Sequence, residues 1–244
     1  MVELFMGDWT EIIKNKIDEF ISLLKQSPQI ENIFNPWREV DIENDIDSKA
    51  PKIRTNQMRH YLLSRLKKAR YLLIGEALGY QGGHFSGIAM TSERILLGYL
   101  QKEGINPHDV LPDLEPRRSS RPEIMSKGFS EPTATIVWGT LLKFGLKPDE
   151  FVLWNVFPWH PFDRRRGILS NRRPTERELR YGYPVLEKFF ELFPGRIVIA
   201  LGKISASVLK SMKINFYEVR HPANAGAQKF RKQIYEILRK TYKN

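Results

Sequence analysis

The sequence predicts an α/β fold, namely a three-layer α/β/α sandwich with a short, mostly parallel central sheet. Two observations lead to this prediction. Four short apolar runs are continuous rather than alternating, which is typical of parallel strands buried on both faces. Segments with apolar residues at helical spacing lie between these runs, and strands that alternate with helices favour a sheet covered by helices on both sides.

The elements follow one another along the chain in that alternating order. Strands are expected at Tyr71–Ile74, Phe151–Trp154, Arg196–Leu201 and Phe216–Val219. Helical spacing of apolar residues predicts helices over residues 8–24, 58–69, 91–102, 133–144, 176–193, 205–212 and 228–242. Thr175 and Glu178 form the capping-box pattern at the start of the helix that runs toward Phe193, and Pro184 should kink or split that helix.

Charge divides the chain into two parts. Residues 1–50 hold 5 basic and 11 acidic residues, whereas residues 51–244 hold 34 basic and 17 acidic ones. We expect residues 1–55 to form a helix and an acidic arm packed on a domain of residues 56–244. The basic domain predicts a polyanionic partner, most often nucleic acid, although a surface rich in Lys, Glu and Arg pairs is the alternative.

Several classes of protein are excluded by composition. The 244 residues include no cysteine, which rules out disulfides, thiolate zinc sites, cysteine-held iron–sulfur clusters and cysteine nucleophiles. No apolar run approaches the ~20 residues that span a bilayer, and the N-terminus lacks a signal pattern. The histidines show no metal-ligand spacing. We expect a cytoplasmic monomer, associated with the nucleoid in a prokaryote, without a membrane partner.

Polar residues follow each predicted strand. They are Glu76, Asn155, the Gly202-Lys203 pair and His221. Because ligands of an open parallel sheet bind beyond the carboxyl ends of the strands, we expect these residues to meet at one edge.

Each candidate also has a purely structural interpretation. The glycines around Glu76 suggest a tight turn that faces a ligand, but an acidic residue there can equally cap a helix. Asn155 can pair with the donor and acceptor of a pyrimidine edge, or bond its own backbone. His221, held extended by Pro222, can stabilise developing negative charge or be an ordinary surface or core histidine. Phe85 can stack on a base or fold back into the core.

Two dense basic runs suit a nucleic acid. Seven arginines lie between residues 164 and 180, and the second run contains Arg117, Arg118, Arg121 and Lys127. Such residues contact phosphates without reading sequence, although charge runs are more often solvated faces.

Four segments together resemble the uracil-DNA glycosylase superfamily. Gly75-Glu76-Ala77-Leu78-Gly79 resembles its first active-site motif, especially the branch that reads Gly-Glu-Ala-Pro-Gly. Residues 83–87 are similar to the segment with the base-stacking Phe, and residues 153–156 to the strand with the uracil-reading Asn. His221-Pro222-Ala223-Asn224 resembles the second motif, whose loop enters the DNA minor groove. The order and spacing agree with a catalytic domain over about residues 65–242.

The resemblance implies a base-excision repair enzyme that flips a damaged nucleotide and hydrolyses its N-glycosidic bond. Glu76 would position or deprotonate water, or stabilise the sugar cation, and His221 would stabilise the departing base anion. The implied substrate-binding residues are Gly75, Ala77, Leu78, Tyr80, Phe85 and Asn155. The implied DNA-binding residues are Lys203, Ser205, Arg220, Pro222, Asn224 and Arg231.

The chain departs from that branch at three points. The branch carries a four-Cys iron–sulfur cluster, which a chain without cysteine cannot hold, so the N-terminal region must be held otherwise, with the 8–24 helix as a candidate. Leu78 replaces a proline, which would have fixed the turn. The 221–224 loop lacks a bulky apolar wedge.

We therefore expect a monofunctional DNA glycosylase that removes a deaminated base, uracil first, from DNA and needs no metal or organic cofactor. One alternative is a non-catalytic nucleic-acid-binding protein that keeps the scaffold, which Leu78 and the missing cluster would suit. Another is a phosphate- or nucleotide-handling enzyme that uses the glycine loop 82–87, whose spacing fits neither common phosphate motif.

Overall fold

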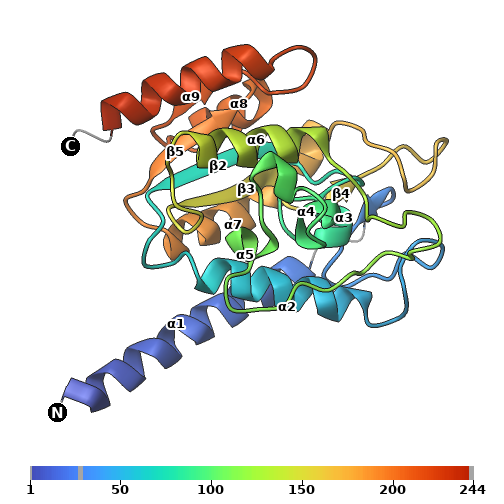
Figure 1. Cartoon of the computed structure of the whole chain (residues 1–244), viewed down its shortest axis with the longest axis horizontal. Helices are drawn as coiled ribbons and strands as arrows, with labels where there is room; N and C mark the ends of the chain where they lie inside the picture. The colour runs from blue at the N-terminus through green and yellow to red at the C-terminus, as the bar shows by residue number, and fades with distance from the viewer. Residues whose placement is uncertain (1, 27–29, 242–244) are drawn as a thin grey trace.

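A four-stranded parallel sheet forms the middle layer of the protein (Figure 1). The computed structural model describes residues 2–26 and 30–241. The strands are β2 (Tyr71–Ala77), β3 (Phe151–Phe157), β5 (Ile197–Leu201) and β6 (Tyr217–Val219), in the order β3-β2-β5-β6. Each overlaps one of the predicted apolar runs. All seven side chains of β3 are buried, which explains why its apolar run does not alternate.

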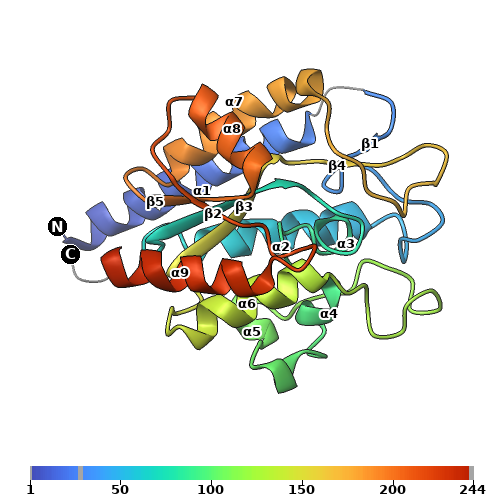
Figure 2. The same cartoon turned by 90° about the horizontal axis from the view of Figure 1, so that it is seen from above.

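Helices cover both faces of this sheet, so the predicted three-layer architecture is confirmed (Figure 2). On one face lie α1 (Val2–Lys25), α7 (Glu176–Leu192) and α8 (Lys203–Ser211), and on the other lie α6 (Pro132–Lys143) and α9 (Ala227–Thr241). None of the described helices is both long and apolar enough for a membrane span.

Helix α2 (Ala50–Leu63) protects the edge strand β3. The Tyr61 hydroxyl accepts a hydrogen bond from the Leu153 backbone N–H at 2.8 Å, and Arg65 Nε donates to the Phe151 carbonyl at 3.1 Å. An edge strand exposes unpaired backbone groups, and these two side chains pair with two of them. The helix begins and ends earlier than the predicted 58–69, and Pro51 occupies its first turn, where a missing N–H costs nothing.

Two further predictions need correction. Residues 91–102 do not form one helix, because Gly98 has φ +78° and separates α4 (Glu93–Leu96) from a 3-10 turn, η1 (Gln101–Glu103). Pro184 does not split α7, which begins with the predicted capping box of Thr175 and Glu178. The remaining short elements are β1 (Ile33–Phe34), α3 (Gly83–Ser86), α5 (Pro107–Val110) and β4 (His160–Pro161).

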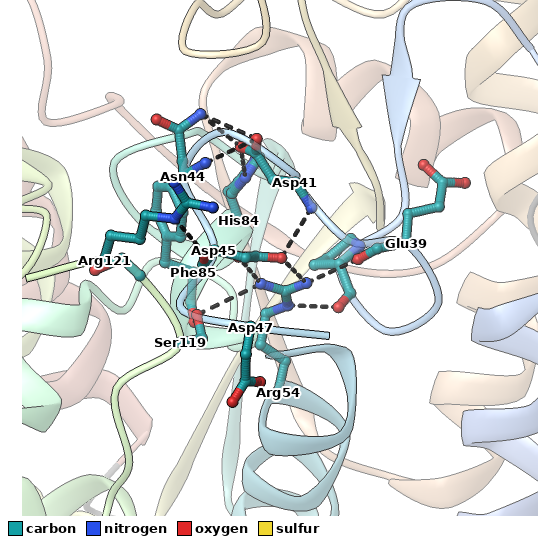
Figure 3. A network of polar contacts seen from close by, with 12 residues as sticks. Glu39, Asp41, Asn44, Asp45, Asp47, Arg54, His84, Phe85, Ser119 and Arg121 are labelled. Atoms are coloured by element: carbon teal, nitrogen blue, oxygen red, sulfur yellow. Dashed lines mark hydrogen bonds and ion pairs between the residues drawn. The ribbon is translucent and has the colours of Figure 1, made fainter. Parts of the chain in front are cut away.

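Buried polar contacts hold residues 30–47, called the arm from here on, against α2 and the segments that follow it. Arg54 of α2 is fully buried and donates to both Asp45 carboxylate oxygens, at 2.5 and 3.0 Å, and to the carbonyls of Pro36 and Glu39 (Figure 3). The end of α1 contributes too, because the Leu24 carbonyl accepts a hydrogen bond from Asn35 Nδ2 at 2.8 Å. The arm also pairs with the domain through β1 and β4.

Candidate active site

The carboxamide of Asn155 lies over Gly75 at the carboxyl end of the sheet. The two residues are register partners in β3 and β2, and Asn155 Oδ1 is 2.5 Å from where a β-carbon on Gly75 would stand. Gly75 is therefore required by this close approach within a strand, rather than by the tight turn expected from the sequence. Asn155 is 2% exposed, and its Nδ2 has no hydrogen-bond partner among the residues that the structure describes.

The turn after β2 is fixed by packing. Leu78 is buried, and its Cδ2 would be only 2.2 Å from a β-carbon on Gly83, so the side chain fills the space that this glycine leaves. The Tyr80 backbone N–H donates to Asn171 Oδ1 at 3.0 Å. Leu78 thus holds the turn through its buried side chain, where a proline would have held it by fixing φ.

Phe85 is fully buried at the centre of a short aromatic cluster. Its ring stacks on Phe129, with centroids 4.2 Å apart and planes at 14°, and lies 4.3 Å from the ring of His84. Tyr80 meets Phe129 edge-on at 6.4 Å. A base cannot reach the Phe85 ring in this conformation, so base stacking there requires the surrounding residues to move.

Glu76 is half-buried at the end of β2. Burial raises the pKa of its carboxyl, while the Arg173 guanidinium lowers it. A carboxylate whose pKa is raised by burial is a common property of catalytic acids and bases.

His221 lies at the same edge of the sheet. Gly202, which follows β5, would bring a β-carbon to 3.3 Å from His221 Cβ, so His221 lies beside the carboxyl end of β5. The Ala223 N–H donates to His221 Nδ1 at 3.2 Å, which leaves the ring proton on Nε2. Burial and the neighbouring Arg220 lower the pKa of His221, so the neutral ring is favoured.

The loop after His221 has an unusual backbone. Asn224 and Ala225 both adopt left-handed φ values, of 54° and 59°, and a β-carbon on Gly226 would stand 2.0 Å from the His221 carbonyl. Pro222 is buried and Asn224 is exposed. The loop is therefore tightly folded and presents Asn224 rather than Pro222 to solvent.

The predicted DNA-binding residues separate by exposure. Lys203, Arg220 and Arg231 are exposed. Ser205 does not fit its predicted role, because it is fully buried and its hydroxyl donates to the carbonyls of Leu201 and Gly202 at 2.9 and 3.0 Å. A phosphate therefore cannot contact Ser205.

Sequence reasoning missed several residues at this site. Asn171 and Arg173 were visible only as part of a basic run, and Phe129 only as a loop residue. Glu131 carries a buried Oε2 without a partner in the described residues, and burial raises the pKa of its carboxyl to about 7. No sequence pattern marked it, since it is a single acid before a helix.

Comparisons with known proteins identify the family and the fold. The sequence model of the uracil DNA glycosylase superfamily matches residues 64–241. The crystal structure of wild-type SMUG2 from Pedobacter heparinus is similar in fold, with a TM-score of 0.59 and 16% sequence identity over 94% of this chain and 99% of that chain. No curated protein matches in sequence. Because the family model matches most of its length, the chain belongs to the uracil-DNA glycosylase superfamily.

Proposed function

We propose that the protein is a DNA glycosylase that hydrolyses the N-glycosidic bond of a flipped, deaminated base, with uracil as the first candidate. The unpaired carboxamide of Asn155 carries the proposal. A buried donor without a partner costs about 1–3 kcal/mol, so such a group is retained where a ligand completes its bonding. The edge of a pyrimidine offers a donor and an acceptor to the two ends of one carboxamide.

Glu76 and the neutral His221 ring would stabilise the charges that develop in this reaction. Water adds to the sugar carbon as the glycosidic bond breaks, and the bonding pair leaves with the base. The neutral His221 ring would donate its Nε2 proton in a hydrogen bond to the base anion, as its Nδ1 is already occupied by the Ala223 N–H. The Glu76 carboxylate would position or deprotonate the water, or stabilise the sugar cation.

Exposed cations near the same edge would hold the DNA. Lys203 begins α8 directly after β5, and Arg220 precedes His221. Base flipping would bring the nucleotide to Asn155, and the enclosed state of Phe85 implies that the 80–85 turn or the Phe129 segment opens first.

The burial of Phe85 favours one rival, a non-catalytic nucleic-acid-binding protein. A scaffold that never admits a base would keep this ring closed.

Glu131 opposes the phosphate-loop alternative. Its Oε2 would lie 2.0 Å from a β-carbon on Gly82, so its carboxyl group lies beside the glycine loop. When ionised, this carboxylate would repel a phosphate.

A uracil-containing oligonucleotide tests the proposal. Wild type should release uracil and leave alkali-labile sites, whereas Glu76→Gln, Asn155→Ala and His221→Ala should not do so at comparable rates. If wild type releases neither uracil, hypoxanthine nor xanthine from single- or double-stranded DNA, but binds undamaged DNA in a salt-sensitive way, the non-catalytic alternative holds.

A further inference from the structure

A buried chain of hydrogen bonds runs from the acidic arm to the loop behind the candidate site. Asp41 Oδ2 lies 3.0 Å from His84 Nε2, His84 Nδ1 lies 2.9 Å from His160 Nδ1, and His160 Nε2 lies 2.8 Å from the Ser170 carbonyl oxygen. Both rings are fully buried and Asp41 is 3% exposed. Figure 3 shows Asp41 facing His84 beside Phe85. The hydrogen-bonded chain is therefore shielded from bulk solvent.

The hydrogen-bonded chain from Asp41 to Ser170 needs more protons than two neutral imidazole rings carry. Both of its ends are acceptors, a carboxylate oxygen at Asp41 and a carbonyl oxygen at Ser170. Each end requires a ring N–H, and the contact between the two Nδ1 atoms requires one more. Two neutral imidazoles carry only two N–H groups, so three hydrogen bonds require a third proton.

We infer that the Asp41–His84–His160 chain binds this third proton as an imidazolium facing the Asp41 carboxylate, and that it is a positioning device for Phe85. The second half of this inference rests on the proposed function. His84 adjoins Phe85 in α3 and is clamped on another side by Phe34, with centroids 4.1 Å apart and planes at 16°. The Phe85 carbonyl accepts a hydrogen bond from Ser119 Oγ at 2.6 Å. The His84 ring on one side and the Phe85 backbone on the other are therefore both held in place.

The surrounding charges act on the proton in opposite directions. Burial lowers the pKa of both rings, that of His160 to about 3, which leaves His84 as the ring that carries the charge. The hydrogen bond from His84 to Asp41 raises the pKa of His84, Arg54 lowers it, and Asp45 raises it. Because burial opposes the charge, raising the pH should remove the third proton and break one link.

Substitutions at Asp41 separate the charge from the hydrogen bond. Asp41→Asn supplies an amide that can donate to a neutral His84, so the chain stays complete with one N–H on each ring. Asp41→Ala removes both the charge and the bond. Asn44→Ala is the matched control, since it removes the amide that donates to Asp41 Oδ1 and Oδ2, at 3.0 and 2.9 Å, but keeps the Asp41 carboxylate and both rings.

Imidazole NMR counts the ring protons directly. At low pH, wild type should show three N–H protons on the two rings. Because burial lowers the pKa of His84, one of them should disappear as the pH rises, before the range in which an exposed histidine titrates. Asp41→Asn should show two at every pH. Two ring N–H protons in wild type at every pH at which it stays folded would overturn the inference.

Uracil release measures the positioning role in the same variants. Asp41→Ala should lose about tenfold or more in kcat/KM, mainly through KM, because a displaced Phe85 weakens base binding. Asp41→Asn should keep a kcat/KM near that of wild type at a pH where His84 is protonated, but its pH profile should lose the step that His84 causes. Asn44→Ala should keep that step. An unchanged profile and KM in Asp41→Ala would reject the positioning role. If wild type releases no base, the proposed function fails while the proton count still stands or falls by NMR.

Discussion

Asn155 and Gly75 are interlocked across neighbouring strands, with Asn155 Oδ1 at 2.5 Å from the point that a Gly75 β-carbon would occupy. The two residues are register partners in β3 and β2. Because Gly75 has no side chain, the carboxamide of Asn155 can occupy the space above it. The first glycine of the motif is thus explained by its neighbour. The same arrangement makes the position of Asn155 sensitive to any change at residue 75.

Gly75→Ala should therefore damage both stability and base binding. The new methyl group would overlap the Asn155 carboxamide, and overpacking of this kind costs about 1–3 kcal/mol in the free energy of unfolding. Gly139→Ala in α6 is the control, because its β-carbon would have only Ile105 Cδ1, at 4.0 Å, as a neighbour. Denaturant unfolding should show a loss for the first variant and none for the second, and equal effects would contradict the overlap.

Glu76→Gln should lose base excision yet stabilise the protein at neutral pH. Because burial raises the pKa of Glu76 in the folded state, ionising it opposes folding. The neutral amide avoids that penalty, so the variant should melt at a higher temperature near pH 7. The advantage should shrink as the pH falls through the raised pKa, where wild type becomes neutral as well. A constant difference in melting temperature across this range would contradict the assignment.

Two arginines of α2 should differ sharply in their contribution to stability. Arg54 and Asp45 have fully buried side chains, whereas those of Arg59 and Asp18 are 35% and 44% exposed. Arg54→Met leaves a buried, unpaired carboxylate and should cost about 3–5 kcal/mol. Arg59→Met breaks a solvated pair and should cost less than about 1 kcal/mol. Similar losses in urea denaturation would show that Arg54 does not hold the arm.

Lys203→Ala should weaken DNA binding by removing one phosphate contact. The slope of log affinity against log salt should fall by about one unit. Lys67→Ala removes the same charge from an exposed position before β2, at the opposite end of the sheet, and should leave the slope unchanged. Fluorescence anisotropy at several salt concentrations measures both slopes. Equal slopes for Lys203→Ala and Lys67→Ala would show that DNA does not bind at the carboxyl edge of the sheet.

Much of the fold could be predicted because burial on both faces leaves a continuous apolar run in each central strand. The positions of Glu76 and Asn155 followed from the rule that parallel strands end at one edge. The break at Gly98 could not be predicted, since a glycine in a helical pattern reveals its φ only through its tertiary contacts. The enclosure of Phe85 was equally hidden, because Phe129 lies far from it along the chain.

The basic runs show where charge alone misleads. Arg172 makes two hydrogen bonds to Glu178, at 2.7 and 2.8 Å, and Arg121 donates to the carbonyls of Ile42 and Asp45. These arginines use their donors to hold loops together, even though Arg121 is exposed. A count of charges cannot separate such internal roles from phosphate binding, because both use the same donors.

Single-turnover release of uracil by wild type and Asn155→Ala is the decisive test of the role of Asn155. Wild type should release uracil, and the variant should lose about 100-fold or more in rate, because two hydrogen bonds to the base are removed. Its free energy of unfolding should change little, because removing the unpaired buried Nδ2 donor offsets the packing that the side chain loses. Equal rates of release from the two proteins would contradict the account.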